Sequence, residues 1–179
     1  MARRKQNHLI HDSERRILIG HALWPVNMTG HDYDAIIVGA GPVGGHLGRI
    51  LSEKGLHVLL LEEHKEIGKP FQCAGLVTPS AMNRVGLHDS VLTDVWGARI
   101  HSPLGTRVEI GEPSILRTHV VCRKLFDEGC VRQAIEAGAT LWVDSKPTDA
   151  EVDDEGVTVS IQREGKDLTL RCKLLCGAD

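Results

Sequence analysis

The sequence of 179 residues lacks a long hydrophobic run, and it lacks the cysteine pairs of a disulfide or metal framework. Residues 17–23 are apolar in part, but they include Gly20 and His21 and are too few and too polar for a signal sequence or a membrane span. The five cysteines are an odd number, and no closely spaced pair is joined to a second pair, as a zinc site requires. We therefore expect a cytoplasmic protein without a metal site.

The front of the chain also lacks the hydrophobic periodicity of a folded element. It carries a group of basic residues, namely Arg3, Arg4, Lys5, Arg15 and Arg16. These could tether the chain to anionic lipid or nucleic acid, but a solvated tail or an overextended reading frame is the interpretation we prefer. We expect residues 1–32 to be a doubtful or disordered extension, residues 33–179 to be the folded domain, and nucleic acid not to be a partner.

A glycine-rich turn between an apolar strand and a helix is the most informative feature present. The strand ends at Val38, and Gly39, Gly41 and Gly44 follow at the spacing of the dinucleotide-binding fingerprint. These glycines allow the tight turn, the close approach of backbone to a pyrophosphate, and the close packing of helix on strand. The helix begins near Val43, and its free N-terminal amides would face the phosphates.

A second apolar strand, residues 58–61, ends at an acidic residue, Glu62. A carboxylate at this position accepts hydrogen bonds from the adenosine ribose and repels the 2′-phosphate of NADP. The strand, helix, strand and acid together predict a βαβ unit that binds FAD or NAD. These residues alone do not separate the two cofactors.

Three further segments resemble the geranylgeranyl reductase family of flavoproteins, within the group built like para-hydroxybenzoate hydroxylase. They are Gly68-Lys-Pro-Phe-Gln-Cys-Ala-Gly-Leu-Val77, Arg123-Lys-Leu-Phe-Asp127 and Cys176-Gly-Ala-Asp179. The resemblance implies a doubly wound, Rossmann-like α/β domain that binds FAD. It also implies reduction of the double bonds of geranylgeranyl chains, on archaeal-type membrane lipids or related precursors.

The resemblance assigns the flavin-side residues. Cys73 matches a cysteine near the flavin that helps to protonate or position the substrate carbon, although it could equally only pack against the ring edge. Ala74 and Gly75 would offer backbone amides to the flavin. Arg123 would reach flavin phosphate or ribose; the alternative is a surface arginine paired with Asp127 or Glu128.

The resemblance also implies two further cofactor contacts, an electron donor and a lipid substrate, and a missing substrate domain. Pro147 occupies the position whose backbone contacts adenine, and Asp179 would lie near the ribityl chain or the nicotinamide entry path. An external donor, NAD(P)H or ferredoxin, would reduce the flavin, and the isoprenoid lipid would be met by peripheral contact with the membrane. Because family members are longer, we expect an N-terminal fragment, with the substrate domain mostly missing and only the start of the substrate-side sheet present.

Several local elements are predicted between these motifs. We expect a helix over 124–137, a hairpin around the turn at 103–105, a strand over 140–143, and strands over 152–161 and 168–175. Cys130, Cys172 and Cys176 are predicted to be small core residues.

Two other functions remain open from the sequence. An FAD-dependent monooxygenase of the same architecture would hydroxylate an aromatic ring. A non-catalytic nucleotide-binding fragment would bind FAD weakly or not at all and would not turn over. The stretch from Phe71 to Gly75 favours the reductase.

Overall fold

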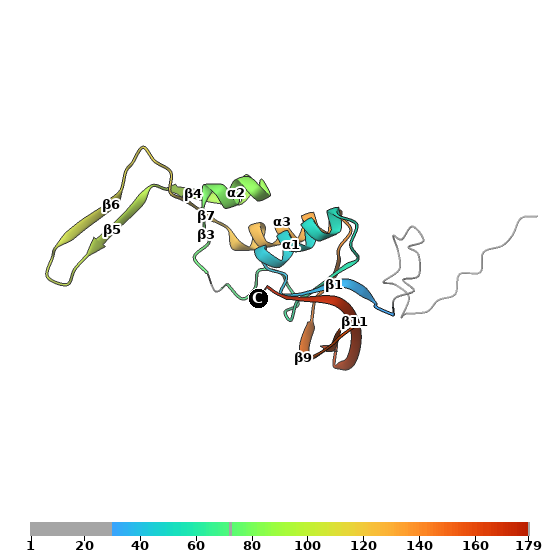
Figure 1. Cartoon of the computed structure of the whole chain (residues 1–179). Coiled ribbons are helices and arrows are strands. Elements are labelled where there is room, and N and C mark those ends of the chain that lie inside the picture. The colour runs from blue at the N-terminus through green and yellow to red at the C-terminus, as the bar shows by residue number, and fades with distance from the viewer. Residues whose placement is uncertain (1–29, 72, 179) are drawn as a thin grey trace, which may run out of the picture.

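A six-stranded sheet forms the centre of the domain (Figure 1). The computed structural model describes residues 30–71 and 73–178, so the predictions made for residues 1–29 and for Asp179 lie outside it. The sheet has the order β8-β2-β1-β11-β10-β9. Its strands are β1 (Tyr33–Val38), β2 (Val58–Leu61), β8 (Thr140–Trp142), β9 (Ser145–Asp153), β10 (Gly156–Arg163) and β11 (Lys166–Gly177). The first four in the order run parallel, and β9 and β10 are antiparallel additions.

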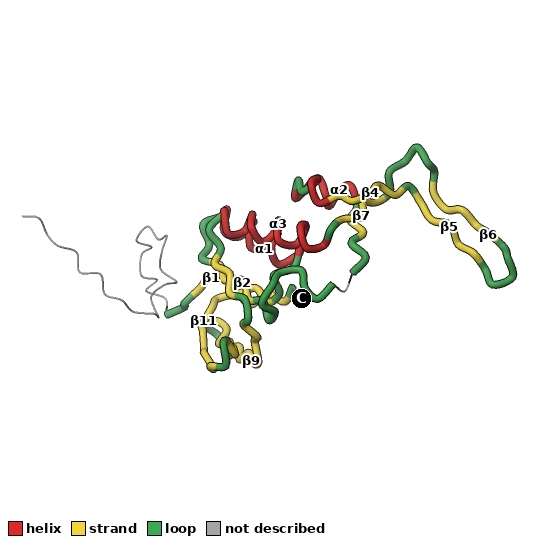
Figure 2. The backbone as a smooth tube through the Cα atoms, turned by 180° about the vertical axis from the view of Figure 1, so that it is seen from behind, coloured by secondary structure: helices red, strands yellow, loops and turns green. Residues whose placement is uncertain are grey.

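Two helices, α1 (Pro42–Glu53) and α3 (Arg123–Glu136), lie side by side on one face of the sheet (Figures 1 and 2). Ile37 and Leu60 of the sheet pack there against Val131 and Ala134 of α3, all nearly or fully buried. The helices approach closely because Gly45 has no side chain. A Cβ atom at Gly45 would lie 2.8 Å from the carbonyl carbon of Cys130.

The other face of the sheet is covered by strands instead of helices. The first half of β11 pairs with β10, and its second half pairs in parallel with β1. Val159 and Ile161 of β10 thereby reach Ile36 and Leu59 in a second buried cluster. The predicted α/β fold with a central parallel sheet is confirmed. The structure also shows that strands, and not helices, cover the second face.

A smaller layer lies beyond the helices. A three-stranded sheet contains β3 (Leu76–Val77), β7 (Thr118–Val121) and β4 (Val91–Val95), next to α2 (Pro79–Val85) and the 3-10 helix η1 (His88–Ser90). The hairpin of β5 (Gly97–His101) and β6 (Arg107–Gly111) extends away from the body of the molecule (Figures 1 and 2). In the described part of the chain, no helix is both long and apolar enough to span a bilayer.

The predicted elements are confirmed with one error. The helix over 124–137 and the hairpin around 103–105 are present, and the strand over 140–143 ends one residue early. The predicted strands over 152–161 and 168–175 are present as the antiparallel pair β10 and β11, but the first begins at Gly156 and not at Val152, because a turn separates it from β9. The carboxylate of Asp153 accepts hydrogen bonds from the amides of Glu155 and Gly156 and stabilises that turn.

Asp32, next to the predicted start of the domain, takes part in the fold. Asp32 donates its backbone amide to the Arg171 carbonyl and accepts the Arg171 amide through its side chain. The division at residue 32 stays a prediction. Cys130 and Cys172 are buried as expected, whereas Cys176 is only partly buried.

Replacing Gly45 with alanine should destabilise the domain. The added methyl group would press on the backbone of Cys130 and Val131, and such overpacking costs about 1–3 kcal/mol. Urea unfolding measures the loss, and Gly177→Ala is the matched control, since nothing lies within 4 Å of its Cβ position. Equal stability of the two variants would contradict the close helix contact.

Candidate functional site

The turn between β1 and α1 has the geometry of a phosphate-binding loop. Gly39 has a φ of 97°, and a Cβ atom at Gly44 would overlap the Gly39 carbonyl oxygen. Gly41 is the N-cap of α1, has no capping side chain, and has open space where a Cβ would be. The first turn of α1 carries no acidic residue. The helix therefore presents a bare, electropositive N-terminus to the cavity beside it.

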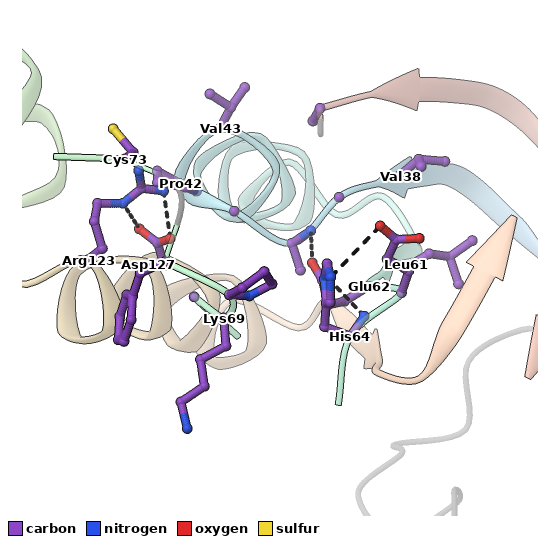
Figure 3. A pocket seen from close by; sticks show the side chains of 18 of the residues that line it. Val38, Pro42, Val43, Leu61, Glu62, His64, Lys69, Cys73, Arg123 and Asp127 are labelled. Carbon is purple, nitrogen blue, oxygen red and sulfur yellow. Dashed lines mark hydrogen bonds and ion pairs between the residues drawn. The ribbon is translucent and has the colours of Figure 1, made fainter. Parts of the chain in front are cut away.

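Glu62 connects the end of β2 to this turn. Its Oε2 accepts a hydrogen bond from the backbone amide of Ala40 at 3.1 Å. Its Oε1 accepts the backbone amide of His64 at 3.0 Å and lies 2.7 Å from Nδ1 of the same residue (Figure 3). The carboxylate is thus held in place at the mouth of the glycine turn, with its remaining lone pairs able to accept hydroxyl groups.

Cys73 lies in the loop between β2 and β3 and is exposed. Its Sγ accepts a hydrogen bond from the backbone amide of Gly75 at 3.5 Å, and the positive charge of the Arg123 guanidinium acts on it as well. These two groups, the Gly75 amide first, lower the pKa of the Cys73 thiol because both stabilise the thiolate. Ala74 and Gly75 follow directly, and a Cβ at Gly75 would overlap the Val121 carbonyl oxygen.

Arg123 opens α3 and makes a bidentate ion pair with Asp127. Nε lies 2.9 Å from Oδ1, and Nη2 lies 2.7 Å from Oδ2. Asp127 is only 3% exposed. The pairing with Asp127 that the sequence left as an alternative is therefore present. Because the Asp127 carboxylate is buried, the pair is not a surface contact. Arg123 also faces the cavity, so the pairing does not remove it from the candidate site.

One cavity of about 720 Å³ brings most of the predicted residues together. It is lined by Gly39, Gly41, Val43, Glu62, Cys73, Arg123 and Pro147. Figure 3 shows the glycine turn between two groups, Glu62 with His64 on one side and Cys73, Arg123 and Asp127 on the other. Gly44 lies in the first turn of α1, and Gly75 lines a neighbouring groove.

Sequence reasoning missed several lining residues. His64 and Lys69 follow Glu62 in the loop, Lys146 lies on β9, and the buried Asp127 lies one turn after Arg123. In the sequence, these residues are marked only by their nearness to predicted site residues. His64 lies two residues after Glu62, and Asp127 is the last residue of the segment that begins at Arg123. Neither spacing identifies a lining side chain without the fold.

A second, more apolar groove of about 600 Å³ adjoins the cavity. Leu47 and Ile50 of α1, Leu76 of β3 and Val85 of α2 line it, with Phe126 of α3. The two spaces share Pro42, Val43, Cys73 and Arg123. The Cys73 thiol therefore lies on the wall between a polar cavity and an apolar groove.

The fold and the glycine turn define a dinucleotide-binding domain. Residues 32–179 match the family model described as FAD binding domain, and the chain belongs to this family. The residues fit the cofactor: the cavity lies within the usual range for ligand pockets, roughly 300–1,000 Å³. The open space at Gly41 leaves room for a pyrophosphate against the backbone, and Glu62 is held where a ribose is read. FAD is the cofactor of this domain.

The chain is similar to proteins of two activities. It is 36% identical over 152 residues to the digeranylgeranylglycerophospholipid reductase of Methanosarcina acetivorans, covering 82% of this chain and 37% of that one. A geranylgeranyl bacteriochlorophyll reductase-like structure from Thermoplasma acidophilum has a TM-score of 0.72 and 27% identity, over 82% of this chain and 39% of that one.

The anhydrotetracycline hydroxylase from Streptomyces rimosus has a TM-score of 0.67 and 27% identity, over 82% of this chain and 31% of that one. The chain thus spans less than two fifths of the length of each of these three proteins. The part that is shared with the reductases and the hydroxylase is the cofactor domain.

Replacing Gly41 with alanine should weaken FAD binding without changing stability. The methyl group meets no protein atom within 4 Å, but it occupies the space beside the helix N-terminus. We expect about tenfold weaker binding, which corresponds to about 1.4 kcal/mol, in a flavin fluorescence titration. Unchanged affinity would place the pyrophosphate elsewhere.

Alkylation should distinguish the exposed thiol of Cys73 from the buried thiol of Cys130. Burial raises the pKa of the Cys130 thiol to about 11, whereas hydrogen bonding lowers the pKa of the exposed Cys73 thiol. Because the thiolate is the nucleophile, iodoacetamide near neutral pH should label Cys73 first and Cys130 only on unfolding. Peptide mass mapping over time measures the order, and equal rates would contradict the described environments.

Proposed function

We propose that this chain is the FAD-binding part of an FAD-dependent oxidoreductase that saturates the double bonds of geranylgeranyl chains on archaeal-type membrane lipids. The observation that supports it most is the position of Cys73. Its thiol faces the FAD cavity on one side and an apolar groove on the other, so a proton donor lies between a redox cofactor and a place for hydrocarbon. The resemblance to named reductases supports the same substrate class.

The cavity residues would hold FAD, which, after reduction by an external donor such as NAD(P)H or ferredoxin, would supply the hydride for one carbon of the double bond. Cys73 donates the proton from Sγ to the other carbon. The Gly75 amide and the Arg123 guanidinium stabilise the thiolate that this transfer leaves, and water reprotonates the thiolate between turnovers. Val43 and Leu76 are largely exposed and line the apolar groove with Cys73, where the hydrocarbon chain would pack against them.

The remaining residues hold the cofactor. Gly39, Gly41, Gly44 and Val43 receive the pyrophosphate at the N-terminus of α1, and Glu62 accepts hydrogen bonds from the adenosine ribose. Ala74 and Gly75 would offer amides to the flavin, Arg123 would add a positive charge, and Pro147 would lie against adenine. Asp179 is outside the described residues, and its expected place near the ribityl chain or the nicotinamide entry path stays a prediction. The protein would act in the cytoplasm, with peripheral membrane contact through its lipid substrate and without nucleic acid.

The proposal is tested by turnover in a chimera. Residues 32–178 of this chain replace the matched part of the Methanosarcina acetivorans reductase, because the chain matches only 37% of that protein. The flavin is reduced anaerobically with dithionite, and a geranylgeranyl lipid is added. Reoxidation of the flavin, with hydrogen gained by the lipid in mass spectrometry, supports the reductase.

Two results would overturn the proposal. Reoxidation only by oxygen, stimulated by an aromatic acceptor, would indicate the monooxygenase, which the similarity to the Streptomyces rimosus hydroxylase keeps as the alternative. A folded chimera without bound flavin would indicate a non-catalytic nucleotide-binding module. The unmodified reductase, assayed in parallel, controls for the lipid and the donor.

Replacing Cys73 with serine should remove the proton donor. A hydroxyl is a far weaker acid than a thiol, so kcat of the chimera should fall by about 100-fold, while FAD affinity stays unchanged. Stopped-flow reoxidation by the lipid measures this. Cys122→Ser is the matched control, since Cys122 is a partly buried cysteine outside both cavities. A change of only a few-fold would restrict Cys73 to packing against the flavin.

A further inference from the structure

Asp127 is the buried residue of the site that the proposed mechanism does not use. It is 3% exposed and lies on α3, one turn after Arg123. Both of its carboxylate oxygens accept hydrogen bonds from the same guanidinium, at 2.9 and 2.7 Å. A bidentate pair fixes the plane of a guanidinium as well as its distance, which a single contact does not.

The Cys73 loop is seated on the same turn of α3 through two glycines. Gly68 has a φ of 74°, and a Cβ there would lie 3.1 Å from Cα of Lys124. At the other end of the loop, a Cβ at Gly75 would overlap the Val121 carbonyl oxygen and lie 3.4 Å from Cγ of Arg123. Backbone contact at both ends holds Cys73 on the same cavity wall as Arg123, and Figure 3 shows the two residues in the same part of the cavity.

We propose that Asp127 is a positioning residue, which clamps the Arg123 guanidinium in the orientation that places it against Sγ of Cys73. The inference rests on the proposed role of Cys73. Asp127 also lines the cavity, but both of its carboxylate oxygens are taken up by the Arg123 guanidinium. Without its carboxylate, the long Arg123 side chain regains rotamer freedom and can turn toward solvent in the open cavity.

The clamp and the charge of Asp127 act in opposite directions on the thiol. As a nearby anion, Asp127 destabilises the thiolate and raises the pKa of Cys73, whereas Arg123, the residue it holds, lowers that pKa. If Asp127 acted only through its charge, its removal would make Cys73 more reactive. If it acts by holding Arg123, its removal makes Cys73 less reactive. The sign of the change separates the two roles.

Other charged groups line the two cavities around the thiol. Lys69 lies on the same loop and pairs with Glu66, His46 and Arg84 lie across the groove, and the far end of the cavity holds Glu62, Glu63, His64 and Lys146. Arg123 lowers the pKa of Cys73, and Asp127 raises it. A rise of this pKa in an Asp127 variant therefore reports on the clamp.

The test is the pH profile of iodoacetamide alkylation at Cys73 in the purified 179-residue chain, followed by peptide mass mapping. In Asp127→Asn we expect the profile to move to higher pH and the rate near neutral pH to fall several-fold. Arg123→Ala should move it in the same direction, and the double variant should lie at lower pH than Arg123→Ala, because it also removes the anion that raises the pKa of Cys73.

Glu128→Gln is the matched control, since Glu128 is a half-exposed carboxylate of the same helix that pairs with Lys124; its profile should equal that of the parent chain. An Asp127→Asn profile that moves to lower pH or stays in place would overturn the proposal. If Asp127→Asn loses its fold by circular dichroism, Arg123→Lys gives the answer, because a lysine cannot be held by a bidentate contact and should also slow alkylation. The measurement needs neither flavin nor lipid, so it can fail while the reductase assay succeeds, or the reverse.

Discussion

The close contact between α1 and α3 determines where the site is. Gly44, Gly45 and Gly48 lie on one side of α1, against the Gly39 carbonyl, the backbone at Cys130 and the side chains of Leu60 and Ala134. The same helix presents its N-terminus to the cavity, and the same contact fixes the start of α3, where Arg123 lies. One glycine-lined interface therefore aligns the phosphate end and the thiol end of the cavity. A larger side chain there would separate the N-terminus of α1 from Arg123, which lies more than 70 positions later in the chain.

Much of this could be predicted, because the signals are local. The βαβ unit is encoded in a continuous segment, with Gly39, Gly41 and Gly44 in the turn and Glu62 after the second strand, and both the fold and FAD are confirmed. The burial of Asp127 could not be predicted, since it depends on packing that no spacing reveals. The predicted start of β10, at Val152, is too early, although the polar residues 153–156 mark the turn that the Asp153 carboxylate stabilises. The assignment of individual residues to the cofactor stays a prediction.

The second face of the sheet shows how a long strand serves two layers. β11 pairs with β10 at its start and with β1 at its end, so a single strand joins the antiparallel cover to the parallel core. Its last residues lead to Ala178, which lines the cavity and donates its backbone amide to the Val38 carbonyl. The cover, the core and the cavity edge are thereby connected through one backbone.

The β5–β6 hairpin forms a two-stranded sheet that is separate from the sheets of the domain body. Among the described residues its strands pair only with each other, and Ile100, Leu104, Val108 and Ile110 are at least half exposed. A two-stranded ribbon without a core is marginally stable in water. Its backbone amides therefore open to solvent independently of the domain, and the hairpin behaves as a separate unit of stability, while the sheet beneath α1 and α3 opens only when the whole domain unfolds.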